Sequence, residues 1–355
     1  MRIGLVGPLP PPAGGMAMQT QQLVELLRGE RADVLLVPTN LPYRPAWVER
    51  LHGVRALFRM FPFLVALWRA AGRSDVMHVM ANSGWSWHLF AAPAIWVASL
   101  RRVPVIVNYR GGEAATFLQR SAGLVRATMR RASRLVVPSS FLQEVFARHQ
   151  MAADVVPNII DLARFHPAEP CATVQLIVAR NLEPIYDNAT ALRAFAQVLT
   201  EYRDARLVVA GTGPEEPALR RLAAELGIAE RVHFAGRLER EAMARLLRES
   251  RVALNPSLAD NMPNSVLEAL ASGVPVVSTN VGGVPHIVAD EESALLVPPA
   301  DPTAMAGAVL RLLHEPALAE RLRAAGLRSV AAYTWEQVGP RWGAAYRCAL
   351  TQGRQ

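Results

Sequence analysis

The sequence predicts an α/β protein with two doubly wound domains, each built on a parallel sheet covered by helices. Short apolar runs of strand length alternate with helical patterns, as in sheets that are buried on both faces. This alternation stops at "DLARFHPAEPCAT" (161–173) and then restarts, which indicates a linker. A chain of 355 residues with 51% hydrophobic and 19% charged residues also favours two globular domains over one.

The first half begins with an apolar strand, "RIGLVGP", a loop, "LPPPAGGM", and a helix with leucines 23, 26 and 27 on one face. Gly14 and Gly15 lack a Cβ, which lets backbone amides approach a phosphate or a sugar. The alternative is a tight connection with no ligand. Five more strands are predicted at "DVLLVP", "DVMHVM", "VPVIVNY", "RLVVPS" and "ADVVPN".

The second half predicts strands at "VQLIVAR", "ARLVVAG", "RVHFAG", "VALNPS" and "VPVVST", with a helix over 191–199. Between the last two strands, Asp260 lies on a loop and Glu268 lies on the predicted helix "SVLEALASG". The first amides of a helix are unpaired and attract anions. Glu268 can accept hydrogen bonds from two vicinal hydroxyls, although both acids can also be read as a helix cap and a solvated side chain. Ligands of such sheets bind at the carboxyl ends of the strands, so the chemistry is expected in a cleft between the two domains.

Composition excludes several classes of protein. All 38 basic residues are arginine, so Schiff-base chemistry and a Walker-type lysine are excluded. Two cysteines, Cys171 and Cys348, are too few for a disulfide framework, and no His or Cys cluster has metal-ligand spacing. No signal peptide is recognised and no apolar segment has spanning length. We therefore expect a soluble, cytoplasmic protein without a metal or cofactor.

Five segments together resemble the retaining glycosyltransferases of family 4. They are "VVPNIIDLARFHP", "ARLVVAGTGPEEPALRRLA", "RVHFAGRL", "ALNPSLADNMPNSVLEALASGVPVVSTNVGGVPHIV" and "SALLVPPADP". The resemblance is densest from Val155 to about Glu336. It implies the GT-B fold, in which two Rossmann-like domains face each other across a cleft. The predicted boundaries are 1–168 for the acceptor-side domain, 169–335 for the domain that binds the nucleotide sugar, and 336–355 for a last helix that crosses back to the first domain.

The resemblance also implies the site residues. The family pattern of two glutamates separated by seven residues is matched by Asp260, which would hold the donor sugar, and Glu268, which would bind the nucleotide ribose. Arg180 matches a phosphate-binding arginine, whereas the family's lysine is missing and Tyr186 or Asp187 falls near its place. The predicted catalytic residues are Asp260, Arg180 and Arg110, and the predicted donor-binding residues are Gly14, Gly15, Arg180, Gly211, Gly213, Arg237, Asn261, Met262, Pro263, Asn264 and Glu268.

Arg110 stands where the family often has a histidine, within "RGGEA". It is expected either to contact a phosphate of the donor or acceptor or only to pair with Glu113. Near it in sequence, Trp85, Trp87, Phe90 and Trp96 are expected mainly to pack in the core, with contact to the acceptor as the alternative.

The resemblance implies transfer of a sugar from a nucleotide diphosphate sugar to a hydroxyl acceptor, a lipid-linked or surface-glycan precursor, without a metal. The alternative is a non-catalytic partner protein that binds sugar nucleotides. Residues 1–168 carry 19 arginines against 9 acidic residues, a net charge of +10, whereas residues 169–355 carry 19 against 21, a net charge of −2. No nucleic-acid motif accompanies the basic half.

The segment "RALFRMFPFLVALWRA" places Arg55, Arg59 and Arg69 beside Phe58, Phe61, Phe63 and Trp68. Basic residues beside aromatic residues favour an anionic membrane surface. Because Pro62 interrupts the helical pattern and such runs often pack on a sheet, core packing remains an alternative.

Overall fold

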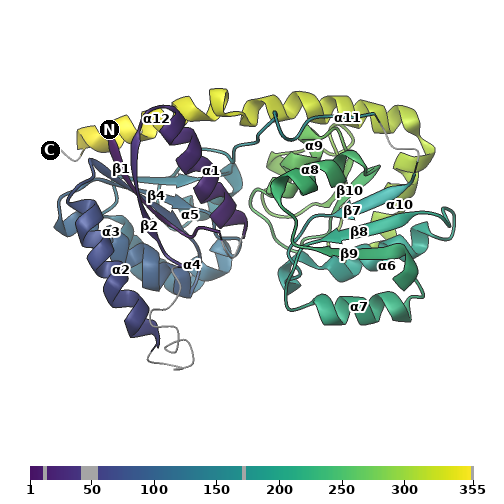
Figure 1. The fold of residues 1–355 in the computed structure, drawn as a ribbon, viewed down its shortest axis with the longest axis horizontal. Helices are drawn as coiled ribbons and strands as arrows, with labels where there is room; N and C mark the ends of the chain where they lie inside the picture. The colour runs from purple at the N-terminus through teal and green to yellow at the C-terminus, as the bar shows by residue number, and fades with distance from the viewer. Residues whose placement is uncertain (11–13, 41–54, 170–172, 353–355) are drawn as a thin grey trace. The chain divides into compact units, whose positions relative to one another are not determined.

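The computed structural model describes residues 1–10, 14–40, 55–169 and 173–352, and the side chains of 55–58 and 352 are outside this description. The chain forms two compact units. The first unit comprises Met1–Asn158 together with Val338–Gln355, and the second comprises Ile159–Gln337. Each unit is a parallel sheet with helices packed on its two faces (Figure 1).

The sheet of the first unit contains the six predicted strands in the order β2-β1-β3-β4-β5-β6. Their bounds are β1 Arg2–Gly7, β2 Asp33–Pro38, β3 Val76–Ala81, β4 Val105–Tyr109, β5 Arg134–Val137 and β6 Asp154–Val155. The helices are α1 Gly15–Gly29, α2 Arg55–Ala71, α3 Ala92–Leu100, α4 Ala114–Met129 and α5 Ser140–Ala147. β3 and β4 are buried along their whole length, as expected for central strands that are covered on both faces.

The aromatic residues of this unit divide between core and surface. Trp87 is fully buried in the core, as predicted, but Trp85 is 78% exposed and Trp96 is 41% exposed, so the expectation of core packing is wrong for these two residues. The expected interruption at Pro62 is also wrong, because α2 continues through it. Phe63 and Leu67 on the same helix are buried in the core, and this packing stabilises the helix despite the backbone hydrogen bond that proline cannot donate. The side chains of Arg55 and Phe58 lie outside the described residues.

The second unit has the strand order β12-β11-β10-β7-β8-β9, which is the order of a dinucleotide-binding sheet. Its strands are β7 Gln175–Val178, β8 Arg206–Ala210, β9 Val232–Gly236, β10 Val252–Asn255, β11 Val276–Thr279 and β12 Leu295–Val297. The first five were predicted, whereas the edge strand β12 was missed because only three residues pair. The helices are α6 Asn188–Val198, α7 Glu216–Glu225, α8 Arg240–Arg248, α9 Asn264–Ala271, α10 Pro302–His314 and α11 Pro316–Val330.

The chain passes between the units at two points. After Asn158, the first residues of the predicted linker already belong to the second unit, because Phe165 is buried in its core and the amide of Ile160 donates to the carbonyl of Tyr333 at 2.9 Å. The last helix, α12 (Trp335–Gln352), packs in the first unit from Val338 onward, where Trp342 and Tyr346 are fully buried. Among the described helices, none is both long and apolar enough to cross a bilayer.

Candidate active site

Arg180 and Asp260, two of the predicted site residues, follow the two central strands of the second unit's sheet. β7 and β10 are neighbours there, and the chain continues from β7 toward one edge and from β10 toward the other. Arg180 follows β7 and Asp260 follows β10. Ligands of open α/β sheets bind at the carboxyl ends of the strands, at this point where the strand order reverses. The strand order therefore brings together two residues that are 80 positions apart in sequence.

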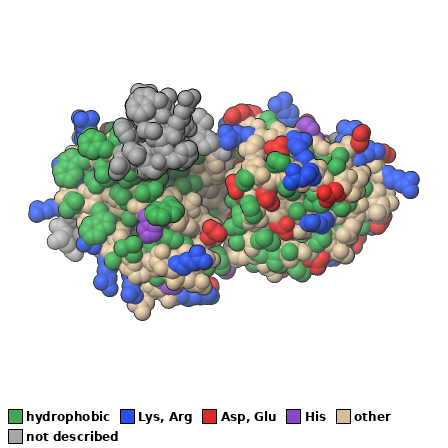
Figure 2. Space-filling model, turned by 90° about the horizontal axis from the view of Figure 1, so that it is seen from below, with side chains coloured by type: hydrophobic (Ala, Val, Ile, Leu, Met, Phe, Trp, Pro, Cys, Tyr) green, Lys and Arg blue, Asp and Glu red, His purple; other side chains and the backbone are tan. Residues whose placement is uncertain are grey.

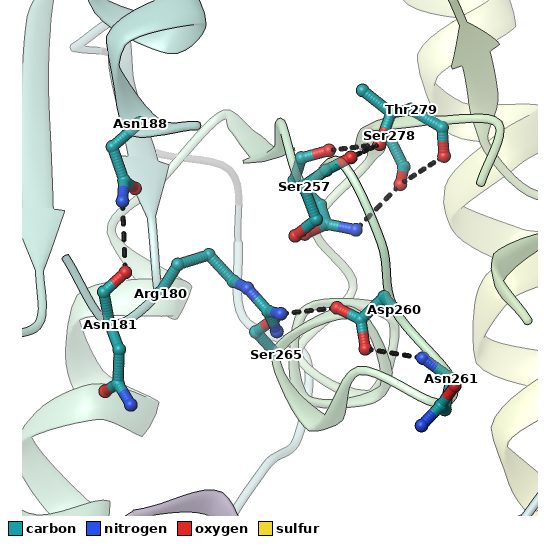
Figure 3. Close-up of polar contacts among 10 residues, drawn as sticks. Arg180, Asn181, Asn188, Ser257, Asp260, Asn261, Ser265, Ser278 and Thr279 are labelled. Carbon is teal, nitrogen blue, oxygen red and sulfur yellow. Dashed lines mark hydrogen bonds and ion pairs between the residues drawn. The ribbon is translucent and has the colours of Figure 1, made fainter. Parts of the chain in front are cut away.

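Arg180 and Asp260 form an ion pair between Nη2 and Oδ2, and their side chains are only 9% and 11% exposed. Nη1 of Arg180 donates to Ser265 Oγ at 3.2 Å, and the guanidinium carbon lies 4.0 Å from the centre of the Tyr186 ring. Figure 3 shows Arg180 reaching from the end of its strand toward Asp260 and Ser265. The guanidinium is thus held by Asp260, Ser265 and the Tyr186 ring. Ser265 was not predicted from the sequence, because a serine in the first turn of a helix can have many roles.

Asp260 has competing electrostatic surroundings. Burial raises its pKa, while the charge of Arg180 and hydrogen bonds from the Asn261 amide, Arg180 and Ser257 lower it. The Asn261 amide donates to Asp260 Oδ1 at 2.9 Å. Both carboxylate oxygens therefore have donors, and the side chain is fixed in one orientation.

Glu268 lies on α9 and is partly exposed. Burial raises the pKa of Glu268 to about 7, and the charges of Arg240 and Arg180 reduce this increase. Among the described residues, none donates a hydrogen bond to its carboxylate. A carboxylate held without donors in a partly dehydrated place can accept hydrogen bonds from a ligand's hydroxyls.

Two glycines pack against the backbone of the Asp260 loop. Gly282 has φ +53°, and a Cβ added there would lie 2.1 Å from the carbonyl oxygen of Asp260. At Gly283 an added Cβ would lie 1.8 Å from the carbonyl oxygen of Asn261, and its own amide donates to Asp260 O at 2.8 Å. The glycine loop after β11 therefore supports the loop that carries Asp260, which explains why the two acids, the turn and the glycines follow one another in sequence.

Gly211 and Gly213 have the same function for Arg180. A Cβ at Gly211 would lie 2.0 Å from the carbonyl oxygen of Arg180, and one at Gly213 would lie 2.3 Å from that of Leu182. Leu182 also accepts a hydrogen bond from the Glu215 amide at 3.0 Å. These glycines were predicted to bind the donor, and the structure gives them a packing function beside the arginine.

A buried polar network supports the ends of β10 and β11 beneath the site. Asn255 donates to Ser278 Oγ at 2.9 Å and accepts from Ser257 Oγ at 2.8 Å, while Thr279 Oγ1 donates to the carbonyl of Ser257 at 2.6 Å (Figure 3). Buried polar groups that are paired in this way rigidify the backbone around them. The sequence gives no indication of this network beyond the polar residues that end each strand.

The structure assigns separate roles to the two residues near the missing lysine. Tyr186 presents its ring to Arg180. Asp187 adopts a left-handed backbone conformation, φ 39°, and caps α6 by accepting from the Thr190 amide and hydroxyl. Asp187 is therefore a structural cap, and only Tyr186 belongs to the site.

The remaining predicted residues of this unit also follow the carboxyl ends of strands. Asn261, Met262 and Pro263 lead into α9, which begins at Asn264, and the side chain of Met262 is buried in the core. Arg237 follows β9 at the edge of the sheet and is exposed. No contact within the described residues joins it to Arg180, Asp260 or Glu268.

In the first unit, Gly14 lies immediately before α1, and Gly15 is the first residue of that helix rather than part of the predicted loop. An added Cβ at either position would meet no atom within 4 Å. Gly14 has an extended backbone, φ −112°, that any residue can adopt. Neither strain nor packing among the described residues requires these glycines, and their role in donor binding stays a prediction.

Arg110 follows β4 and has three amide partners instead of a carboxylate. Its Nε donates to Asn108 Oδ1 at 2.7 Å, and its Nη1 donates to Gln19 Oε1 at 3.1 Å and to Asn158 Oδ1. The expected alternative of an ion pair with Glu113 is wrong, because the guanidinium contacts these three amide oxygens and forms no ion pair with Glu113 in the described part of the chain. Burial lowers the pKa of Arg110 to about 9, so it remains charged at neutral pH.

His78, a buried histidine that was not predicted from the sequence, lies next to Asn108, one of the partners of Arg110. His78 on β3 is fully buried, with Nε2 3.0 Å from Asn108 Nδ2 and Nδ1 2.8 Å from the hydroxyl of Tyr346 on α12. Burial and then the charge of Arg110 lower the pKa of His78 to about 3. A histidine within an apolar strand gives no sequence signal of such partners.

Two family models match this chain. The model for glycosyl transferases group 1 matches residues 173–315, and the model for glycosyltransferase family 4 matches residues 6–164. The phosphatidyl-myo-inositol mannosyltransferase of Mycobacterium leprae is 26% identical, over 99% of this chain and 98% of that protein. A D-inositol 3-phosphate glycosyltransferase of Streptomyces avermitilis is 30% identical, but over 63% of this chain and 53% of that protein.

Solved structures share the fold at low sequence identity. Sucrose-phosphate synthase from Thermosynechococcus elongatus matches with a TM-score of 0.79 and 21% identity, covering 98% of both chains. Anabaena HepE in complex with UDP matches with a TM-score of 0.77 and 15% identity, covering 98% of this chain and 100% of that one. Their similarity shows the two-domain architecture and carries no residue assignment.

Proposed function

Because this chain belongs to the family 4 glycosyltransferases and has the GT-B fold, we propose that it transfers a sugar from a nucleoside diphosphate sugar to a hydroxyl group, with retention at the anomeric carbon and without a metal. The observation that supports this most directly is the Arg180–Asp260 ion pair at the point where the strand order of the second unit reverses. HepE, which shares the fold, has been crystallised with UDP and with UDP-glucose.

Arg180 is proposed to bind the donor diphosphate. An arginine can bind phosphate oxygens with two parallel hydrogen bonds, and its charge stabilises the leaving diphosphate. In the structure Asp260 pairs with this guanidinium and neutralises its charge. Phosphate therefore competes with Asp260 for the guanidinium, and the first amides of α9 provide further donors toward the anion.

The two acids have different proposed tasks. Asp260, once it shares Arg180 with phosphate, accepts hydrogen bonds from the donor sugar and holds it near the reacting carbon. Glu268 accepts from the two ribose hydroxyls of the nucleotide. Since the acceptor attacks from the face that the diphosphate leaves, the departing phosphate takes the acceptor's proton, and no side-chain nucleophile is required. The protein accelerates this reaction by positioning and by stabilising charge.

The acceptor is proposed to bind in the first unit. Relatives named for phosphatidyl-myo-inositol and D-inositol 3-phosphate suggest an acceptor hydroxyl on a polyol that carries a phosphate. The first half carries a net charge of +10, and the charge of Arg110 is balanced by no carboxylate partner among the described residues. A phosphate of either substrate fits this arginine.

We also propose that the first unit works on an anionic membrane surface at the cytoplasmic side. Several large apolar side chains of this unit are exposed, namely Phe61, Leu64, Trp68, Trp85, Trp96, Leu100 and Leu124. Hydrophobic side chains gather on one face of this unit, with basic side chains around its edge (Figure 2). Arg101 lies 4.7 Å from the Trp68 ring and Arg131 lies 3.5 Å from the Trp96 ring, so cations accompany the aromatic residues.

The donor assignment is tested by thermal stabilisation with UDP, GDP, ADP and dTDP sugars, because a ligand that binds only the folded state raises Tm. With the active donor, Asp260→Asn should retain binding and lose turnover, whereas Arg180→Ala should lose both and Glu268→Ala should weaken binding. EDTA should leave the rate unchanged. Donor binding without hydrolysis or transfer to any acceptor would support the alternative of a non-catalytic sugar-nucleotide-binding protein.

A further inference from the structure

Four side chains from three parts of the first unit form one hydrogen-bonded chain that ends at the candidate phosphate-binding arginine. It runs from Arg110 through Asn108 on β4 and His78 on β3 to Tyr346 on α12. Three of its members, Asn108, His78 and Tyr346, are essentially inaccessible to solvent, with exposed fractions of 0%, 0% and 1%. We refer to Asn108, His78 and Tyr346 as the relay.

The direction of every bond in the relay follows from Arg110. A guanidinium only donates, so Asn108 must present Oδ1 to it and Nδ2 to His78. Nδ2 also only donates, so His78 Nε2 must accept, and the proton of the neutral ring lies on Nδ1, from which it is donated to the Tyr346 hydroxyl. In each bond, the accepting lone pair therefore faces the neighbour that lies nearer to Arg110 along the chain of hydrogen bonds.

This polarity stabilises a positive charge. Dipoles whose negative ends point to a partly buried cation compensate for part of its lost hydration. Carboxylate pairing would do the same but would also cancel the charge that attracts an anion. Nη2 of Arg110 has no hydrogen-bond partner among the described residues, and the side chain as a whole is partly exposed. The guanidinium is therefore fixed on two nitrogens and has a third available.

We propose that the relay positions Arg110 as a charged binding site for a substrate phosphate group, so that Asn108, His78 and Tyr346 are positioning residues although they never contact the ligand. This proposal depends on the proposed role of Arg110 in substrate binding. The phosphate belongs either to the donor diphosphate or to the acceptor.

The test compares single-site variants by calorimetric titration with UDP, GDP and D-inositol 3-phosphate. Arg110→Gln should weaken binding of one probe by roughly tenfold or more, as expected for loss of a charged hydrogen bond. A nucleotide response assigns the donor phosphate, and an inositol phosphate response assigns the acceptor phosphate. Tyr346→Phe removes only the end of the relay and should weaken the same probe by roughly threefold to tenfold.

Tyr109→Phe is the matched control, because Tyr109 is equally buried, lies beside the relay on β4 and bonds instead to Ser83 Oγ at 2.7 Å. It removes the same hydroxyl group and should leave the affinity for both kinds of probe at the wild-type value. Kinetics add a second criterion. Tyr346→Phe should raise KM for the substrate whose phosphate binds Arg110, and it should leave KM for the other substrate unchanged. A merely structural defect would affect both.

Asn108→Asp is a second variant for the case that Tyr346→Phe does not fold. It turns an oxygen toward His78 Nε2 and introduces the carboxylate that Arg110 lacks, so it should weaken the same probe by roughly tenfold. If Arg110→Gln weakens binding while Asn108→Asp and Tyr346→Phe bind as the wild type does, the relay proposal is wrong and the role of Arg110 stands. If Arg110→Gln binds every probe normally, the role of Arg110 is wrong and the relay has no function in binding.

Discussion

At the scale of single residues, Glu268 links stability to pH. Its ordinary pKa of 4.5 is raised to about 7 in the folded protein, so the native state binds a proton that the unfolded chain has already released between these values. Stability from this group is therefore complete below pH 4.5 and is lost as the pH rises through 7. The loss corresponds to about 3 kcal/mol at most.

We expect Glu268→Gln to be more stable than the wild type by a margin that is near zero at pH 4.5 and reaches 2 to about 3 kcal/mol above pH 7. Urea unfolding at several pH values from 4.5 to 8.5 measures this margin. The variant should also lose nucleotide-dependent stabilisation, because it cannot accept from two hydroxyls as a carboxylate does. A margin that does not change with pH would contradict the burial of an ionisable Glu268.

Tyr186 lies near the place of the family's missing lysine, and two substitutions test whether it belongs to the phosphate-binding site. Its ring covers the Arg180 guanidinium at 4.0 Å. Tyr186→Phe keeps this contact and should transfer at the wild-type rate. Tyr186→Lys loses about 1 kcal/mol of cation–π attraction and adds a like charge, so it should lower Tm without ligand but increase the Tm rise produced by a nucleoside diphosphate. Identical behaviour of the two variants would remove Tyr186 from the site.

At the scale of elements, the two loops after β10 and β11 behave as one unit. Gly283→Ala would bring a methyl group within 1.8 Å of the Asn261 carbonyl oxygen and must displace the Asp260 loop. We expect a loss of about 2 kcal/mol or more in unfolding free energy and a fall in turnover that exceeds any fall in donor affinity. The free energy comes from urea unfolding, and the two kinetic quantities come from transfer assays.

The control for this prediction is Gly307→Ala, on the exposed side of α10, where an added Cβ meets nothing within 4 Å. Alanine stabilises a helix interior relative to glycine, so this variant should gain about 0.5–1 kcal/mol and keep full activity. Equal effects of the two substitutions would mean that the close approach of the two loops is unimportant.

The sequence predicts strands better than it predicts side-chain partners. Eleven of the strands were readable because buried parallel strands are continuous apolar runs, whereas β12 pairs over only Leu295–Val297. Arg180 and Asp260 were recognised by motif, but Ser265 and Tyr186 as partners of Arg180 follow only from the three-dimensional arrangement. For Arg110, the nearby Glu113 suggested a partner, but two of its three amide partners, Gln19 and Asn158, lie 91 and 48 positions away. Short-range patterns contain no information about such contacts.

At the scale of the whole molecule, the basic first half predicts binding to anionic vesicles. The protein should float with liposomes that contain anionic lipid at low salt and should be released as salt is raised, because exposed charges are screened. Trp68→Ala should reduce recovery, since Trp68 is 48% exposed beside Arg101. Leu258→Ala, at a comparably exposed apolar residue of the second unit, should not. Equal recovery with neutral and anionic vesicles would leave the basic half without this explanation.

The discontinuity of the first unit has a consequence during protein synthesis. Its last helix, from Val338 onward, is translated only after the whole of the second unit, Ile159–Gln337. At about 5–20 residues per second the ribosome needs roughly 10 to 40 s for that stretch. During this time His78 lacks its tyrosine partner, and the surface that later covers Trp342 is open to chaperones. The first unit is therefore begun first and completed last, and premature termination within α12 should yield a nascent chain whose second unit is protease-resistant while its first unit is digested.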